Sequence, residues 1–170
     1  ALPLSESINK TIQRINKAHA DKAVSAYFDN RYYLAVPLLN EDGSGSETII
    51  ENNAVIVYNF LNKQWESVDT FPSDFEILDL IVAGKGTNRA VYAINKQGGI
   101  HQLDVNESGQ DAIISTLGQS TADPISVVSK ARTRQFTLND IDRKKWRDYE
   151  IHAESGITYP SNFNIFANTE

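Results

Sequence analysis

The spacing of apolar residues near the start of the chain is that of a helix. Ile8, Ile12 and Ile15 recur at intervals of four and three residues, which places them on one side of an amphipathic helix. Ser5 precedes this stripe and can cap the first turn. The stripe is narrow and has no Trp or Phe anchors, which disfavours a helix lying on a membrane surface. We therefore predict one amphipathic helix within residues 1–22, from Ser5 to about Ala20, that packs on a sheet or on a neighbouring chain.

From residue 23 the pattern changes to short strands separated by turn residues. Asp29-Asn30 tolerates positive φ and can close a tight hairpin, and Pro37 belongs at a strand end because it has no backbone donor. Strands that arrive every 8 to 12 residues or so favour an all-β architecture over alternating helices and strands. The predicted strands are Ala23–Phe28, Arg31–Leu38, Ala54–Asn59, Gln64–Asp69, Leu78–Ala83, Arg89–Ile94 and Ile100–Asp104.

Two stretches within residues 23–110 look like related units. Ala26–Asp69 and Leu78–Asp104 each contain a strand centred on tyrosine, a turn, and a strand that ends in aspartate. Each is of roughly the size of a propeller blade. A propeller needs at least about four blades to close. We expect either that these blade-like repeats belong to a larger assembly, or that they form an open sheet that needs a partner.

The last third of the chain has a different pattern. We predict that Ile113–Leu117 and Ile125–Leu138 are strands, and that Lys144–Ala153 returns beside the second of them. Residues 111–154 would then form a long β-hairpin platform, followed by an extended tail over residues 155–170. The predicted fold class is mainly β, with propeller-like blades of short antiparallel strands, a β-hairpin platform and one N-terminal amphipathic helix.

Composition narrows the possible functions. The 170 residues are 41% hydrophobic and carry a net charge of −6, so broad binding to nucleic acid is disfavoured. Cysteine is absent, which excludes disulfides, thiolate metal sites and cysteine nucleophiles. No apolar run approaches the roughly 20 residues of a membrane span. The chain begins at Ala1 and has no methionine, which indicates a processed product, a piece of a longer protein, or simple loss of the initiator residue.

The sequence offers little for catalysis. The three histidines have no partner at the spacing of a zinc motif, and no Gly-x-Ser-x-Gly elbow occurs. Gly84-Lys85-Gly86 lacks the Ser or Thr of a phosphate-binding loop, and a strand follows it, so we interpret it as a hairpin turn. We predict that the chain is not an enzyme and that it has no catalytic residue, cofactor or metal.

Two segments leave alternatives open. Asn40–Glu51 nearly matches the ligand spacing of a calcium loop, but it begins with Asn and lies between strands, so a solvated loop is the preferred interpretation. Asp140 and Asp142 could suggest acid–base chemistry, but the basic run that follows them favours an exposed turn. That run, Arg143–Arg147, includes Trp146 and is consistent with a nucleic-acid contact or with a contact between subunits.

Two sets of residues resemble the nozzle, or tubular tail, proteins of short-tailed bacteriophages. The first set is Arg31–Pro37 (Arg-Tyr-Tyr-Leu-Ala-Val-Pro) followed by Val55–Asn59 and Trp65-Glu66, which resembles a blade of those propeller-bearing proteins. The second is Thr133–Phe136 followed by Lys144–Ile151, which is similar to the strand pair that leads from the propeller to a platform. The resemblance covers residues 5–153, although the family's members are several times longer.

The resemblance implies a virion structural protein that forms a ring around the channel through which DNA leaves the particle. It implies homo-oligomers, contacts with other tail proteins, DNA that passes without specific binding, location in the virion, and no role for a membrane. The alternative hypothesis is a small non-catalytic β module that recognises a carbohydrate or a protein through exposed aromatics such as Trp65 or Tyr159. We expect Tyr32, Tyr33, Tyr58 and Trp65 to pack the blades, and Arg132, Arg134, Lys145 and Trp146 to contact other units.

Overall fold

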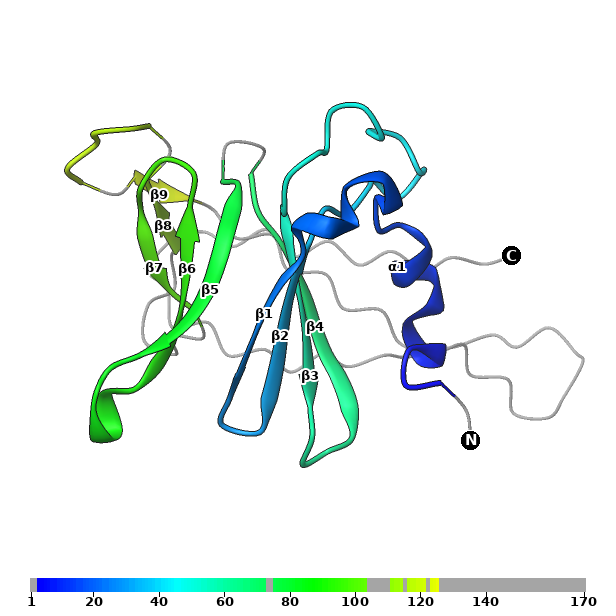
Figure 1. Cartoon of the computed structure of the whole chain (residues 1–170), viewed down its shortest axis with the longest axis horizontal. Helices are drawn as coiled ribbons and strands as arrows, with labels where there is room; N and C mark the ends of the chain where they lie inside the picture. The colour runs from blue at the N-terminus through cyan, green and yellow to red at the C-terminus, as the bar shows by residue number, and fades with distance from the viewer. Residues whose placement is uncertain (1–2, 73–74, 104–110, 115, 122, 126–170) are drawn as a thin grey trace, which may run out of the picture. The chain divides into compact units, whose positions relative to one another are not determined.

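The chain folds mainly into antiparallel β-sheets (Figure 1). The computed structural model describes residues 3–72, 75–103, 111–114, 116–121 and 123–125. The first sheet has four strands in sequential order, and the second has three. A separate short hairpin follows. The first sheet consists of β1 (Val24–Phe28), β2 (Arg31–Val36), β3 (Ala54–Asn59) and β4 (Gln64–Thr70); the second of β5 (Ile77–Ala83), β6 (Ala90–Asn95) and β7 (Ile100–Gln102); and the hairpin of β8 (Asp111–Ile113) and β9 (Asp123–Ile125).

Tight turns set the register of the first sheet. Asp29 and Asn30 both have positive φ, of 47° and 60°, which confirms the predicted hairpin between β1 and β2. Lys63 supplies the left-handed residue (φ 52°) in the turn between β3 and β4. With these turns in place, Tyr33 stands opposite Val57 and Leu34 opposite Ile56, so alternate residues of each strand point to opposite faces of the sheet.

One face of the first sheet packs on the second sheet. Val55 and Val57 lie in an apolar cluster with Leu80, Val91 and Ala93 of the second sheet. Phe75, which is 1% exposed, belongs to the same cluster. The first strands of the two sheets, β1 and β5, lie side by side without pairing. The core therefore lies between two sheets that meet most closely at their first strands.

The opposite face of the first sheet is covered by the N-terminal segment. Val36, Ala54 and Ile56 are buried there, and Ile8 and Ile15 pack against them. Since both faces are covered, every residue of β3 is buried. This explains why β3 has a continuous apolar sequence instead of an alternating one.

The N-terminal segment contains one α-helix, as predicted, but the predicted length, from Ser5 to about Ala20, is wrong. The segment instead contains a 3₁₀ turn (η1, Glu6–Ile8), one short α-helix (α1, Asn9–Gln13) and a second 3₁₀ segment (η2, Lys17–Lys22). The break has a physical cause, because Ile15 forms a bridge with Leu38 and the N–H of Asn16 donates to the carbonyl of Pro37. Ser5 precedes η1 but makes no side-chain capping bond. The predicted apolar stripe nevertheless packs on the sheet through Ile8 and Ile15.

The strand predicted at Ile113–Leu117 is also wrong. The strand β8 ends at Ile113, and Leu117 lies in a turn with 79% of its surface exposed. Gly118 has φ of 84°, and the N–H of Gln119 donates to the carbonyl of Thr116, which closes this turn. Residues 126–170 lie outside the described residues. They include most of the predicted strand Ile125–Leu138, the return strand Lys144–Ala153 and the tail over residues 155–170.

Candidate functional site

A row of aromatic side chains crosses the first sheet. Tyr27 of β1 pairs with Tyr32 of β2, Tyr32 with Tyr58 of β3, and Tyr58 with Trp65 of β4. The rings of Tyr58 and Trp65 meet edge to face with centroids 5.0 Å apart. Tyr33, the fourth residue expected to pack a blade, points to the opposite face and lies in the core between the sheets.

The two ends of this aromatic row differ in exposure. Trp65 is half-buried, and its Nε1 donates to the carbonyl of Leu4 at 3.0 Å, which ties the N-terminal segment to β4. At the other end Tyr27 is 58% exposed and Phe60 is 48% exposed. Phe60 contacts both Tyr27 and Tyr58, with centroids 5.7 and 5.0 Å apart. The exposed aromatics at this end are thus Tyr27 and Phe60, whereas the hypothesis of a ligand-binding module had named Trp65.

The tips of the two hairpins of the first sheet are joined to each other. The backbone N–H of Phe60 donates to the carbonyl of Asn30 at 2.8 Å. Arg31 and Asn59 each donate to the carboxylate of Glu66, at 2.6 Å. The hydrogen bond from Arg31, followed by that from Asn59, lowers the pKa of Glu66. The exposed pair Tyr27 and Phe60 therefore lies at an end of the sheet where hydrogen bonds join the two hairpins.

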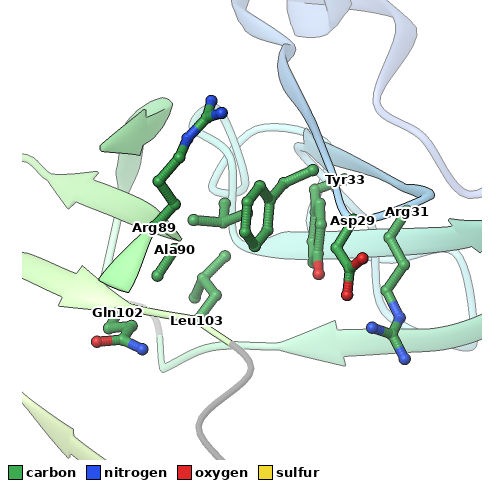
Figure 2. A pocket seen from close by; sticks show the side chains of 9 residues that line it. Asp29, Arg31, Tyr33, Arg89, Ala90, Gln102 and Leu103 are labelled. Atoms are coloured by element: carbon green, nitrogen blue, oxygen red, sulfur yellow. The ribbon is translucent and has the colours of Figure 1, made fainter. Parts of the chain in front are cut away.

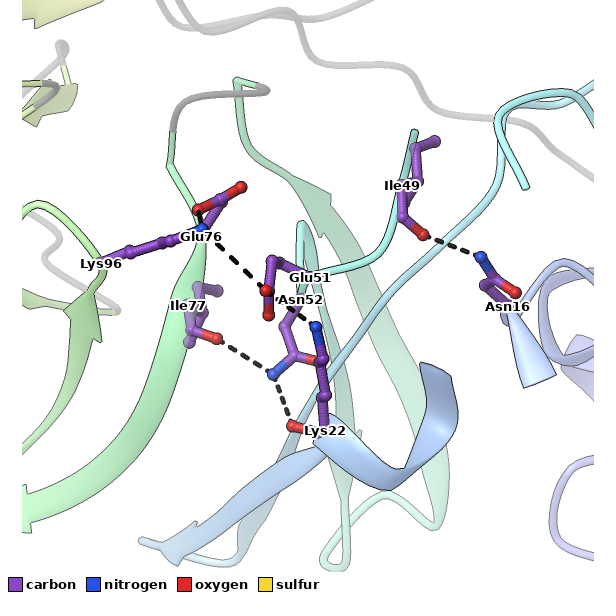
Figure 3. A network of polar contacts seen from close by, with 8 residues as sticks. All are labelled: Asn16, Lys22, Ile49, Glu51, Asn52, Glu76, Ile77 and Lys96. Carbon is purple, nitrogen blue, oxygen red and sulfur yellow. Dashed lines mark hydrogen bonds and ion pairs between the residues drawn. The ribbon is translucent and has the colours of Figure 1, made fainter. Parts of the chain in front are cut away.

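A second polar group joins the N-terminal segment to the second sheet (Figure 3). Lys22 pairs with Glu51 at 2.8 Å, and Lys96 pairs with Glu76 at 2.7 Å. The hydrogen bond to Glu76 raises the pKa of Lys96. Asn52 is 1% exposed, and its Nδ2 donates to the carbonyls of Lys22 and Ile77 at 2.8 and 3.0 Å.

Asn52 therefore connects the N-terminal segment to the first strand of the second sheet. Its Oδ1 has no hydrogen-bond partner in the described part of the chain. The predicted loop Asn40–Glu51 is thus solvated at its start, and a buried asparagine that was not predicted, Asn52, directly follows it.

Several side chains that the calcium interpretation needs as ligands already bind other residues of the chain. The carboxylate of Glu51, which the calcium interpretation needs as its last ligand, pairs with Lys22 and lies 4.0 Å from Lys96. Asn40 donates to the hydroxyl of Ser44, whose N–H donates to Asp42. Hydrogen bonds from the side chain and then from the backbone of Ser44 lower the pKa of the Asp42 carboxyl. The described residues contain no group of three or more His, Cys, Asp or Glu side chains that could hold a metal ion.

A small pocket opens where the turn between β1 and β2 faces the second sheet (Figure 2). Its volume is about 220 Å³. Asp29, Arg31 and Tyr33 stand on the side of the first sheet, and Arg89 and Gln102 stand on the side of the second. Phe28, Val91, Ala90 and Leu103 supply the apolar part of the lining.

His101 and the segment Gly84-Lys85-Gly86 lie in separate parts of the second sheet. His101 lies in β7 and packs against Phe75, with ring centroids 4.8 Å apart. Gly84 and Gly86 lie in the turn region between β5 and β6, as predicted, and both have positive φ. The candidate interface residues Arg132, Arg134, Lys145 and Trp146 lie outside the described residues, so their role stays a prediction.

The pocket and the buried asparagines were not predicted from the sequence. Asn59 and Asn95 both end a central strand, and both accept hydrogen bonds from backbone N–H groups of the turn that follows. An asparagine placed between an apolar strand and a turn is the sequence signal that could have identified them. The pocket has no such signal, because its residues come from separate turns and strands.

None of the helices in the described ranges has the length and apolar character needed to cross a membrane. No protein-family model matches the sequence, and comparisons with curated proteins and with solved structures found no match either.

Proposed function

We propose that this chain is a non-catalytic structural protein of a virion, a component of a phage tail nozzle that assembles into a ring around the DNA exit channel. The observation that carries the proposal is the contact between the two sheets. Two successive antiparallel meanders stack through a shared apolar core, and their first strands lie closest together. Propellers stack successive blades around a central channel in this manner, with one such strand from each blade nearest the channel.

The surface of the sheets supports an assembly. The face of the second sheet that points away from the first carries the half-buried Tyr92 and Ile94, and Ile100 is 67% exposed. An apolar face of this kind is normally buried against another layer. Further blades, from this chain or from other copies, would cover it and complete the ring.

The charge of the chain fits passage of DNA without specific binding. The net charge of −6 repels phosphates, so a channel wall of this composition would not retain the duplex. Strand pairing and apolar burial would hold the ring together, and no catalytic step is required.

The mass of the full chain in solution tests the proposal. We expect light scattering to show a closed oligomer and electron microscopy to show rings with a central channel. Reversing charge at the predicted contacts, in Arg134→Glu with Lys145→Glu, is expected to dissociate the rings without unfolding the subunit. Lys63→Glu, in the exposed turn between β3 and β4, is the matched control. A strictly monomeric protein at high concentration would contradict the proposal.

A further inference from the structure

The pocket between the turn after β1 and the second sheet contains unused hydrogen-bonding groups. Asp29, Arg89 and Gln102 come from three separate parts of the chain and line the same space (Figure 2). Among the described residues, none of these three side chains makes a hydrogen bond or an ion pair. Arg31 differs, because its guanidinium pairs with Glu66.

The apolar part of the pocket has a defined shape. Phe28 and Leu103 belong to the apolar layer at the edge of the core between the sheets. The guanidinium of Arg89 stands over the ring of Phe28, 5.9 Å from its centroid, and this contact positions Arg89 at the rim. A ligand would therefore meet a mainly polar lining, in which a carboxylate, a guanidinium and an amide surround a small apolar part.

We infer that this pocket binds a single sugar ring. Asp29 accepts hydrogen bonds only, Arg89 donates only, and Gln102 can do both. Neighbouring hydroxyl groups of a sugar both donate and accept, so its hydroxyls match the mixture of acceptor and donor groups in this lining. Because the lining carries both signs of charge, neither a simple anion nor a simple cation pairs with all three side chains.

The size of the pocket supports the same class of ligand. Its volume of about 220 Å³ lies slightly below the ~300 Å³ at which sites for drug-sized ligands begin. One sugar ring or one terminal residue of a glycan is therefore the appropriate scale. This inference does not depend on the proposed role in a tail, because it rests on the pocket alone.

Saturation-transfer NMR on the full chain, with a panel of methyl glycosides of neutral, amino and acidic hexoses, tests the inference. We expect at least one glycoside to show transfer to its ring protons. Asp29→Gly preserves the turn, since glycine accepts positive φ, and Gln102→Ala removes an exposed amide. Each is expected to weaken binding by about tenfold, the effect of losing roughly 1.4 kcal/mol of hydrogen bonding.

Gln64→Ala is the matched control, because Gln64 is also an exposed glutamine on a strand of a sheet but does not line the pocket. Its affinity should equal that of the unmodified chain, and circular dichroism should show that all three variants are folded. Absence of saturation transfer with every glycoside would overturn the inference. Binding that survives both pocket substitutions, or binding of free amino acids but of no sugar, would overturn it as well.

Discussion

The central strands of the two sheets differ in burial although their sequences are similar. Ala54–Asn59 (Ala-Val-Ile-Val-Tyr-Asn) and Ala90–Asn95 (Ala-Val-Tyr-Ala-Ile-Asn) begin with the same two residues and end with the same asparagine. All six residues of β3 are buried, whereas Tyr92 and Ile94 of β6 are only half-buried. The N-terminal segment covers the outer face of the first sheet, which accounts for the burial of β3 on that side.

The same strand pattern therefore occurs in a sheet covered on both faces and in a sheet with one partly open face. The first sheet is an inner layer, between the N-terminal segment and the second sheet. The second sheet has one face in the shared core and one face that is partly open. The partly open face of the second sheet is therefore more suitable for packing against further layers. The covered outer face of the first sheet is the one on which stability depends most.

The largest expected effect comes from the covered face. Ile56 of β3 is fully buried on the face that the N-terminal segment covers. Ile56→Ala should therefore reduce the free energy of unfolding by about 2–5 kcal/mol. Ile94→Ala, on the half-buried face of β6, should cost only about 1 kcal/mol because part of its side chain is already in water. Urea denaturation measures both. Equal losses would show that the outer face of the second sheet is as well covered as that of the first.

A smaller effect is expected where the N-terminal segment meets the second sheet. Asn52→Ala removes the two hydrogen bonds to the carbonyls of Lys22 and Ile77 in a buried position, which should cost about 1–3 kcal/mol. Asn62→Ala, in the exposed turn between β3 and β4, should change stability by less than about 0.5 kcal/mol. Thermal unfolding of the two variants makes the comparison. If Asn52→Ala were as neutral as Asn62→Ala, the buried amide would not link these elements.

The smallest effect is expected from the ion pair at the hairpin tips of the first sheet. Because the pKa of Glu66 is lowered in the folded chain, its contribution to stability is present above the pKa of an unfolded glutamate, near 4.3. That contribution is lost as the pH falls through the lower, folded-state pKa. Carboxyl NMR titration should show the lowered pKa, and Arg31→Ala should return it toward its ordinary value. An unchanged pKa in that variant would mean that Arg31 does not stabilise the carboxylate.

The sequence predicted the strands of both sheets because short apolar segments and turn residues are local signals. Ala54–Asn59 was predicted with its observed bounds, and the hairpin at Asp29-Asn30 follows from the tolerance of these residues for positive φ. The helix is shorter than predicted because the backbone N–H of Asn16 donates to the carbonyl of Pro37, and the Asn16 side chain adds hydrogen bonds to the carbonyls of Ser46 and Ile49. Local propensity cannot anticipate a bond to a partner about thirty residues away.

In the aromatic row, too, the strands could be predicted from local sequence but the contacts between distant residues could not. The sequence placed Tyr32, Tyr58 and Trp65 on strands, but only the register showed that they are cross-strand neighbours and that Tyr33 faces the other way. Trp65 was expected to pack a blade or, in the alternative hypothesis, to be exposed for a ligand, and the structure shows its indole donating to the carbonyl of Leu4. That contact brings together residues about sixty positions apart.

By itself, then, the amino-acid order determined that this chain forms short antiparallel strands, because alternation and turn chemistry act between neighbouring residues. The tertiary structure alone decided which faces are covered, where the N-terminal helix breaks, and that Asp29, Arg89 and Gln102 share one pocket. Those outcomes depend on contacts between distant segments, and the free energy of such contacts exists only once the sheets have come together.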